Sequence, residues 1–363
     1  VGGDEAGKAA WKDCPLCQRK AQELGLKHVN ALQGHLIRHM NTFLASHGRT
    51  LVGWDEVMAD TLEPGTHIMN WRSTELAREA AARNLKVILT PGAYCYLDYY
   101  QDAPPFQPEA IGGYLPLEQV YRFVSMEELD TEARKAVCGV QGNLWAEYIP
   151  TVEHAEYMLY PRALALAEIG WNADARAPFA DFRKRAATVC DHLREEGVNT
   201  FNLHTEIGLR KEYQTPITHK AIGKKVTYNH PYSPYYPAAG TTNLTDGLRG
   251  GWTHTDKRWQ GFIGGKRFDI TIDLETPQTV RSVATGFMHA PGAEIYAPSA
   301  YIISVSNDGE TFTEVENTTF DGTDTTTCQT YIWKGKLKAR YLRIQAPGSA
   351  KGGWVFADEV VVK

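Results

Sequence analysis

The feature that most constrains this chain is the alternation of short apolar runs with helical patterns over residues 1–205. One helical pattern, at 73–84, is rich in alanine and other strong helix formers. The apolar runs lie at 50–56, 66–73, 85–92 and 136–147. Strands that alternate with helices form parallel βα units, because a parallel strand pair needs a long crossover connection. The sequence therefore predicts an α/β fold in this part of the chain.

Three helical segments carry boundary signals. Ser125 and Glu128 have the spacing of a capping box, which marks a helix start. Pro161 lies inside an apolar helical pattern at 153–171 and predicts a kink. Gly197 follows the next helical pattern and predicts a C-terminal cap.

Acidic and aromatic residues recur where the predicted strands end. The carboxyl ends of all strands face one site in a βα barrel, whereas only the switch-point strands do so in an open doubly wound sheet. Five such strand ends in succession favour the barrel. Residues 1–205 supply about four and a half βα units of the eight that a barrel needs. We therefore expect the second half of a (β/α)8 TIM barrel, beginning at the end of strand 4.

Two adjacent carboxylates, Asp4 and Glu5, follow Gly2 and Gly3. Adjacent strand residues point to opposite faces, so both acids reach one substrate only where the strand ends and turns, a path that glycine permits. Neighbouring like charges also separate two pKa values, so that one acid stays protonated. The alternative is a solvated pair in a loop, and the tryptophans at the next strand ends favour a site.

Tryptophan recurs at three predicted strand ends. Three such residues in one structural position suggest an apolar box that holds a methyl group and excludes water, although a single tryptophan is more often core. The three are Trp54, Trp71 and Trp145. Tyr96, Asp98 and Glu147 lie nearby in the sequence pattern, where a tyrosine hydroxyl donates to a carbonyl and carboxylates accept from sugar hydroxyls.

From about residue 226 the pattern changes to apolar and polar residues in alternation. Turn signals such as Asn307–Asp308–Gly309 separate the runs, and no long helical pattern remains. The sequence predicts an antiparallel β-sandwich over 226–363, joined to residues 1–205 by a linker at 206–225.

Composition excludes several classes of partner. The net charge of −5 and the absence of a basic stripe argue against nucleic acid. No apolar run is long enough to span a membrane. Six scattered cysteines do not form a disulfide framework. Cys14 and Cys17 form a CxxC without a second ligand pair for zinc, so ordinary thiols are favoured over a metal or redox role.

Five motifs in order resemble the second half of a family 20 glycoside hydrolase, the β-N-acetylhexosaminidases: VGGDE, GWDE, NWRS, YLDYYQ and GVQGNLWAEYI. The resemblance covers about residues 1–205. The family pattern at the end of the fourth barrel strand is His-x-Gly-Gly-Asp-Glu, and Val1 stands at the x. The resemblance implies a retaining exo-enzyme that removes terminal β-linked N-acetylglucosamine or N-acetylgalactosamine without a cofactor or catalytic metal.

The resemblance also implies roles for the candidate residues. Glu5 is the general acid/base, and Asp4 orients and stabilises the substrate acetamide, which itself attacks the anomeric carbon. Trp54, Trp71 and Trp145 form the acetamide box. Tyr96 binds the acetamide carbonyl, and Asp98 and Glu147 bind sugar hydroxyls.

The family places a sugar-binding arginine at the end of the first strand and usually a small α/β domain before the barrel, and neither is in this sequence. We therefore expect another polypeptide segment to complete the barrel. The resemblance implies an extracytoplasmic location. The alternative function is a non-catalytic glycan-binding fragment.

Residues 226–363 resemble the discoidin-like domains of coagulation factor 5/8 type C, through motifs such as NLTDGLRGGWTHTDKRWQGF. The resemblance implies sugar binding by exposed loop aromatics, or else a packing module in which these tryptophans are buried. The candidates are Trp252, Trp259, Tyr296 and Trp354. Some relatives hold a structural calcium near the TDG loop, to which Asp246 and Glu359 would contribute.

Overall fold

The computed structural model describes residues 1–59, 62–123, 129–172, 175–263 and 268–363. The chain divides into two compact units. The first unit contains Val1–Asp98, Leu115–Ala146 and Pro150–His204. The second contains Tyr99–Tyr114, Glu147–Ile149 and Thr205–Lys363.

The first unit is built on a four-stranded parallel sheet in the order β1-β2-β3-β4. The strands are β1 (Val52–Trp54), β2 (His67–Asn70), β3 (Lys86–Leu89) and β4 (Val137–Val140). Each strand lies within one of the four predicted apolar runs, and neighbours in the sheet are neighbours in the chain. This is the strand order of a βα barrel, and it confirms the predicted α/β class.

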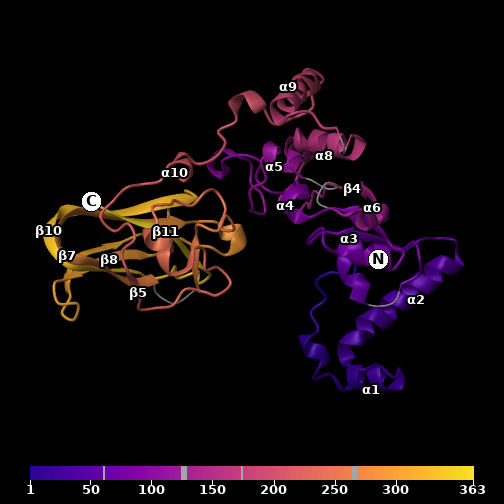
Figure 1. Ribbon diagram of the computed structural model, residues 1–363, viewed down its shortest axis with the longest axis horizontal. Helices are drawn as coiled ribbons and strands as arrows, with labels where there is room; N and C mark the ends of the chain where they lie inside the picture. Colours follow the sequence, from indigo (N-terminus) through magenta and orange to yellow (C-terminus); the bar gives the residue numbers. More distant parts are fainter. Residues whose placement is uncertain (60–61, 124–128, 173–174, 264–267) are drawn as a thin grey trace. The chain divides into compact units, whose positions relative to one another are not determined.

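Helices α1 and α2 precede the first of these strands, and further helices connect the strands and follow them (Figure 1). They are α1 (Pro15–Glu23), α2 (Leu32–Ser46), α3 (Leu76–Ala82), α4 (Gly92–Cys95), α5 (Leu117–Tyr121), α6 (Thr131–Ala136), α7 (Val152–Leu159), α8 (Arg162–Trp171) and α9 (Phe179–Glu195). Short 3-10 turns lie at η1 (Ala9–Trp11), η2 (Val29–Ala31), η3 (Asp55–Ala59), η4 (Pro104–Phe106) and η5 (Leu203–Thr205).

The boundary predictions have different outcomes. Ser125 and Glu128 lie outside the described residues, and α6 is capped by Asp130, whose side chain accepts from the Ala133 N–H.

Pro161 separates α7 from α8 instead of kinking one helix, so that prediction was wrong. Proline lacks the N–H that would continue the helix. Gly197 directly follows the cap of α9 with φ of +90°, as predicted.

The second unit is dominated by antiparallel strands, which form the sheet drawn in orange and yellow in Figure 1. The strands are β5 (Val226–Tyr228), β6 (Gln260–Phe262), β7 (Phe268–Met288), β8 (Ala300–Ser306), β9 (Thr313–Thr319), β10 (Cys328–Ala346) and β11 (Val355–Val362). Their order is β6-β11-β7-β10-β8-β9, with β5 also on β7. Register shifts interrupt the long β7–β10 pairing, and such irregularities bend strands around a core. The architecture agrees with the predicted sandwich.

Residues 206–225, which we expected to be a linker, are hydrogen-bonded to the sandwich. The Ile217 N–H donates to the Gly247 carbonyl at 2.8 Å, and the Lys220 N–H donates to the Val362 carbonyl at 2.9 Å. This segment also contains α10 (Lys211–Gln214). It is therefore packed as part of the second unit.

Across the described ranges, no helix combines the length and the apolar character that crossing a membrane requires.

The sandwich core predicts a large effect for one aromatic residue. Phe287 is fully buried, and its ring contacts those of Phe268 and Tyr331 at 5.6 and 5.2 Å between centroids. Phe287→Ala should lower the free energy of unfolding by about 3–5 kcal/mol, because it leaves a cavity. Phe106→Ala, in the same unit but 70% exposed, is the control. Chemical denaturation of the two variants measures these free energies, and equal losses of unfolding free energy would contradict the expectation.

Candidate active site

The segment that carries Asp4 and Glu5 lies beside β1. The backbone nitrogen of Val1 donates to the Val52 carbonyl at 2.7 Å, and the Trp54 N–H donates to the Gly2 carbonyl at 3.3 Å. These contacts place the two exposed carboxylates next to the carboxyl end of β1.

The position directly before the two acids accepts only glycine, because of its backbone conformation and its close packing. Gly3 has φ of +100°, and a Cβ there would lie 2.8 Å from Cγ1 of Val57. Glu5 itself has φ of 48°, a left-handed conformation that few non-glycine residues adopt. The chain therefore turns sharply at the acids, as the double glycine indicates.

Three of the predicted aromatic residues meet at the strand ends. The ring of Trp54, at the end of β1, lies 5.7 Å from that of Trp145, which follows β4. The Tyr96 ring, after β3, lies 6.1 Å from the Trp145 ring in an edge-on arrangement. We call Trp54, Tyr96 and Trp145 the aromatic cluster. Trp145 is 39% exposed, so one side of the cluster is open to a ligand.

Asn143 joins the segments that carry Tyr96 and Trp145. Its carbonyl accepts from the Leu97 N–H at 2.7 Å, and its N–H donates to the Cys95 carbonyl at 2.8 Å. Its buried side chain donates to the Thr90 hydroxyl at 2.7 Å. The two aromatic rings are thus held by backbone contacts across adjacent loops.

Trp71, the remaining predicted box residue, is held by two acids of the GWDE motif. Its indole N–H donates to Glu56 at 3.1 Å, and its backbone N–H donates to Asp55 at 3.3 Å. Asp55 is buried and also binds the backbone and guanidinium of Arg72. The GWDE motif places both acids directly after Trp54, but the sequence alone does not reveal this positioning role.

The two predicted hydroxyl-binding acids have different surroundings. Asp98 is only 2% exposed and lies near the buried Arg162. Burial lowers the pKa of the Arg162 guanidinium, and the charge of Asp98 acts in the opposite direction and raises it. Arg162 also donates to the Leu97 and Leu115 carbonyls. Glu147 is exposed and belongs to the second unit. Sequence reasoning missed Arg162, whose partners lie far along the chain.

Two candidate aromatics of the sandwich follow the packing alternative. Trp259 is 1% exposed, and its indole N–H donates to the Gly251 carbonyl. Trp354 is partly buried against Tyr236 and Phe356. Both side chains belong to one small apolar cluster, as expected of a packing module.

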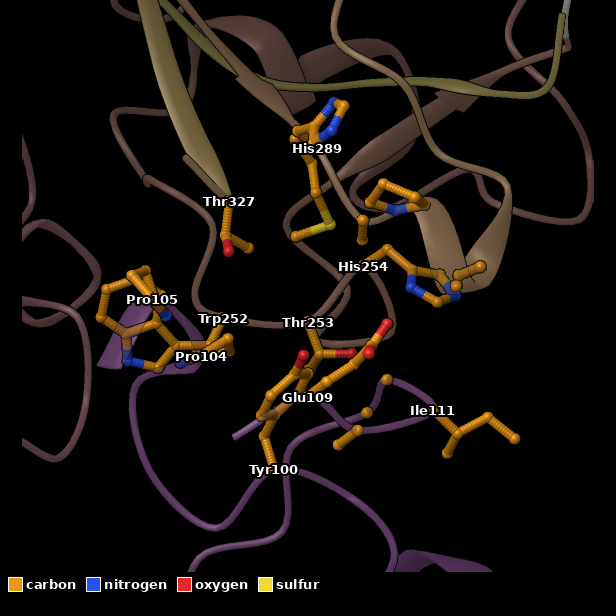
Figure 2. A pocket seen from close by; sticks show the side chains of 18 of the residues that line it. Tyr100, Pro104, Pro105, Glu109, Ile111, Trp252, Thr253, His254, His289 and Thr327 are labelled. Carbon is orange, nitrogen blue, oxygen red and sulfur yellow. The ribbon is translucent and has the colours of Figure 1, made fainter. Parts of the chain in front are cut away.

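A separate pocket of about 390 Å³ lies within the second unit (Figure 2). The loop residues Tyr100 and Glu109 line one part of it, and Trp252, His254 and His289 line another. Burial lowers the pKa of both histidines. The pocket therefore offers neutral imidazoles, hydroxyls and a carboxylate to a polar ligand.

The expected calcium ligands are engaged with other groups. Glu359 is fully buried, with one carboxylate oxygen 2.9 Å from Nε2 of His219 and the other accepting from the Gly247 N–H. Burial and the adjacent Asp246 raise the pKa of Glu359 to about 9. In the structure both oxygens of Glu359 thus contact protein groups, and calcium at this loop stays a prediction. Over the part of the chain that is described, no group of three or more His, Cys, Asp and Glu residues could hold a metal.

A parallel βα sheet with carboxylates and an aromatic cluster at the strands' carboxyl ends is the layout of an active site in a βα-barrel enzyme. Residues 1–174 match the family model for the catalytic domain of glycosyl hydrolase family 20, and residues 225–360 match that of the F5/8 type C domain. The chain thus joins a family 20 catalytic segment to an F5/8 type C domain.

Relatives agree with this assignment. A beta-hexosaminidase of Porphyromonas gingivalis is 44% identical over 201 residues, which cover 55% of this chain and 26% of the relative. One of Vibrio furnissii is 36% identical over 182 residues, or 49% of this chain and 30% of the relative. A solved exo-β-N-acetylglucosaminidase from Vibrio harveyi, in complex with N-acetylglucosamine, aligns with a TM-score of 0.51 and 32% identity, covering 56% of this chain and 32% of that one. This chain thus spans less than a third of each of these relatives.

The Asp55 contacts predict a stability effect. Asp55→Asn should lower the free energy of unfolding by about 1–3 kcal/mol, because it removes the charge that binds Arg72 and the Trp71 backbone inside the protein. Glu79→Gln, which weakens an exposed pair with Arg83, should cost less than about 0.5 kcal/mol. Chemical denaturation measures the free energy of unfolding of each variant. Equal losses of this free energy in the two variants would contradict the role of Asp55.

Proposed function

We propose that the full-length protein is a retaining exo-β-N-acetylhexosaminidase that hydrolyses terminal β-linked N-acetylglucosamine or N-acetylgalactosamine. The observation that carries the proposal is the aromatic cluster beside the strand end that bears Asp4 and Glu5. The beta-hexosaminidase relatives support it. The described residues contain four parallel strands, half the number that a closed barrel needs. We therefore propose that further strands of the full-length polypeptide complete the site.

The proposed reaction uses the substrate's own acetamide as nucleophile. Its oxygen attacks the anomeric carbon and forms a cyclic oxazolinium, while Glu5 protonates the departing glycosidic oxygen. Water activated by the Glu5 carboxylate then opens the ring. Two inversions at one carbon retain the β-configuration.

Positive charge develops on the acetamide during the attack. Asp4, next to Glu5 in the chain, carries the opposite charge and would stabilise that nitrogen. The aromatic cluster would surround the acetamide methyl, with Trp71 as a further wall. The Tyr96 hydroxyl would donate to the acetamide oxygen, which fixes its direction of attack. Asp98 and Glu147 would accept from sugar hydroxyls.

A second candidate function is glycan binding without catalysis. The observation that favours it is the pocket of the second unit, whose hydroxyls, imidazoles and carboxylate suit a polyhydroxylated ligand. This candidate requires that the strand-end acids have no role in turnover.

Glu5→Gln separates the two candidates. Loss of the proton donor should reduce release of a chromogenic β-N-acetylglucosaminide or β-N-acetylgalactosaminide by about 100- to 10,000-fold in kcat. Glu23→Gln, an exposed helical residue of α1, is the matched control and should retain full activity. An active Glu5→Gln variant would refute the acid/base assignment. An inactive wild-type full-length protein would favour the glycan-binding candidate.

Trp145→Ala tests the aromatic cluster. Removal of this ring leaves Trp54 and Tyr96 without their shared neighbour and should lower kcat/KM by about 100-fold, because the acetamide is no longer held for attack. Trp171→Ala is the control, since this tryptophan is 94% exposed at the end of α8. Similar kcat/KM values for the two variants would show that the cluster does not bind the acetamide.

A further inference from the structure

The CxxC of the sequence lies at the start of helix α1. Cys14 is the N-terminal cap residue, Pro15 is the first helical residue, and Cys17 follows on the first turn. Both thiols are half-buried, so a small reagent can reach them. Neither residue has a role in the proposed hydrolysis, and the inference below does not depend on that function.

The two thiols interact and are not equivalent. The backbone N–H and the thiol of Cys17 lower the pKa of Cys14, and the Leu16 N–H adds to this effect. The same contact with Cys14 raises the pKa of Cys17. Of the two thiols, Cys14 therefore loses its proton more readily than Cys17.

The other cysteines have different environments. Burial raises the pKa of Cys95 and Cys328 to about 12 and also raises that of Cys190. Cys138 is exposed on β4 and has no neighbouring thiol in its strand. Cys14, at the start of α1, is thus the thiol best suited to nucleophilic attack, because the thiolate is the reactive form.

The position of the pair suits closure of a disulfide. Cys14 has an extended backbone, with φ of −85° and ψ of 112°, and therefore stands just outside the helix. Its sulfur accepts from the Cys17 N–H, as an N-cap side chain does, and contacts the Cys17 thiol. Both thiols are partly exposed, and exposed pairs are more readily oxidised and reduced than structural disulfides. In the described residues no third metal-ligating side chain joins the pair, which argues against a metal site.

We propose that Cys14 and Cys17 form a redox-active dithiol, which low-molecular-weight disulfides oxidise reversibly. The Cys14 thiolate attacks the reagent's S–S bond, forms a mixed disulfide and expels one thiolate. Cys17 then loses its proton and attacks the Cys14 sulfur, which expels the second thiolate. The protein loses two electrons and two protons, and one reagent disulfide becomes two thiols.

Oxidised glutathione is the probe, and the full-length protein is the sample. Trypsin should release residues 13–19 as one peptide that contains both thiols and no other cysteine. After exposure to the probe, this peptide should lose two hydrogen atoms in mass and regain them with a reducing agent. A peptide that stays reduced, or that keeps a glutathione adduct without closing the disulfide, would overturn the proposal.

Two variants assign the roles of the thiols. Cys17→Ser should trap glutathione on Cys14, whereas Cys14→Ser should leave Cys17 largely unmodified. With iodoacetamide near pH 7, Cys14 should react about tenfold faster than Cys138. Cys138→Ser is the matched control and should leave the closure unchanged. Equal rates at Cys14 and Cys138, or trapping on Cys17 instead of Cys14, would overturn the assignment.

Discussion

The register of the parallel sheet is the constraint on which the proposed site depends. Gly53 pairs with Ile68, Asn70 pairs with Leu89, and Leu89 pairs with Val140. Parallel strands lie about 4.7–4.9 Å apart and end at the same edge. Residues just beyond these positions are therefore brought within contact distance, although they lie far apart in the sequence. Trp54 and Trp145 follow strands that are three spacings apart, so their contact at 5.7 Å also depends on the loop that carries Trp145 beyond β4. A slip of one residue in any strand would turn its side chains to the opposite face and disperse the aromatic cluster.

Buried polar residues hold the loops that follow these strands. Asp55, Asn143 and Arg162 are each at most 6% exposed, and each binds backbone groups of a loop that carries a candidate residue. Burying a polar group costs desolvation free energy unless the group is hydrogen-bonded. Removing one partner of such a hydrogen bond therefore destabilises the protein, because the other partner stays buried and unpaired. The loops of the site are thus fixed by specific polar contacts, since they lack the regular hydrogen bonding of a strand or helix.

The strands could be predicted because they rest on local pattern. Short apolar runs mark buried strands, and the structure has Trp54 as the last residue of β1 and Trp145 five residues beyond the end of β4. Arg162 could not be found in this way, because its carbonyl partners are supplied by distant loops. The sequence also left open whether Trp259 is exposed or buried, and the structure buries it. A turn-rich sequence predicts a loop, but whether a loop side chain is buried depends on tertiary packing.

The central claim is that the strand-end residues use the substrate's acetamide as the nucleophile. The most direct test compares two chromogenic substrates of the full-length protein, a β-N-acetylglucosaminide and the β-glucoside that lacks the acetamide. The account predicts steady release from the first and, on the second, kcat/KM lower by at least about 1,000-fold, because the intramolecular attack is lost. Comparable kcat/KM values on the two substrates would contradict it.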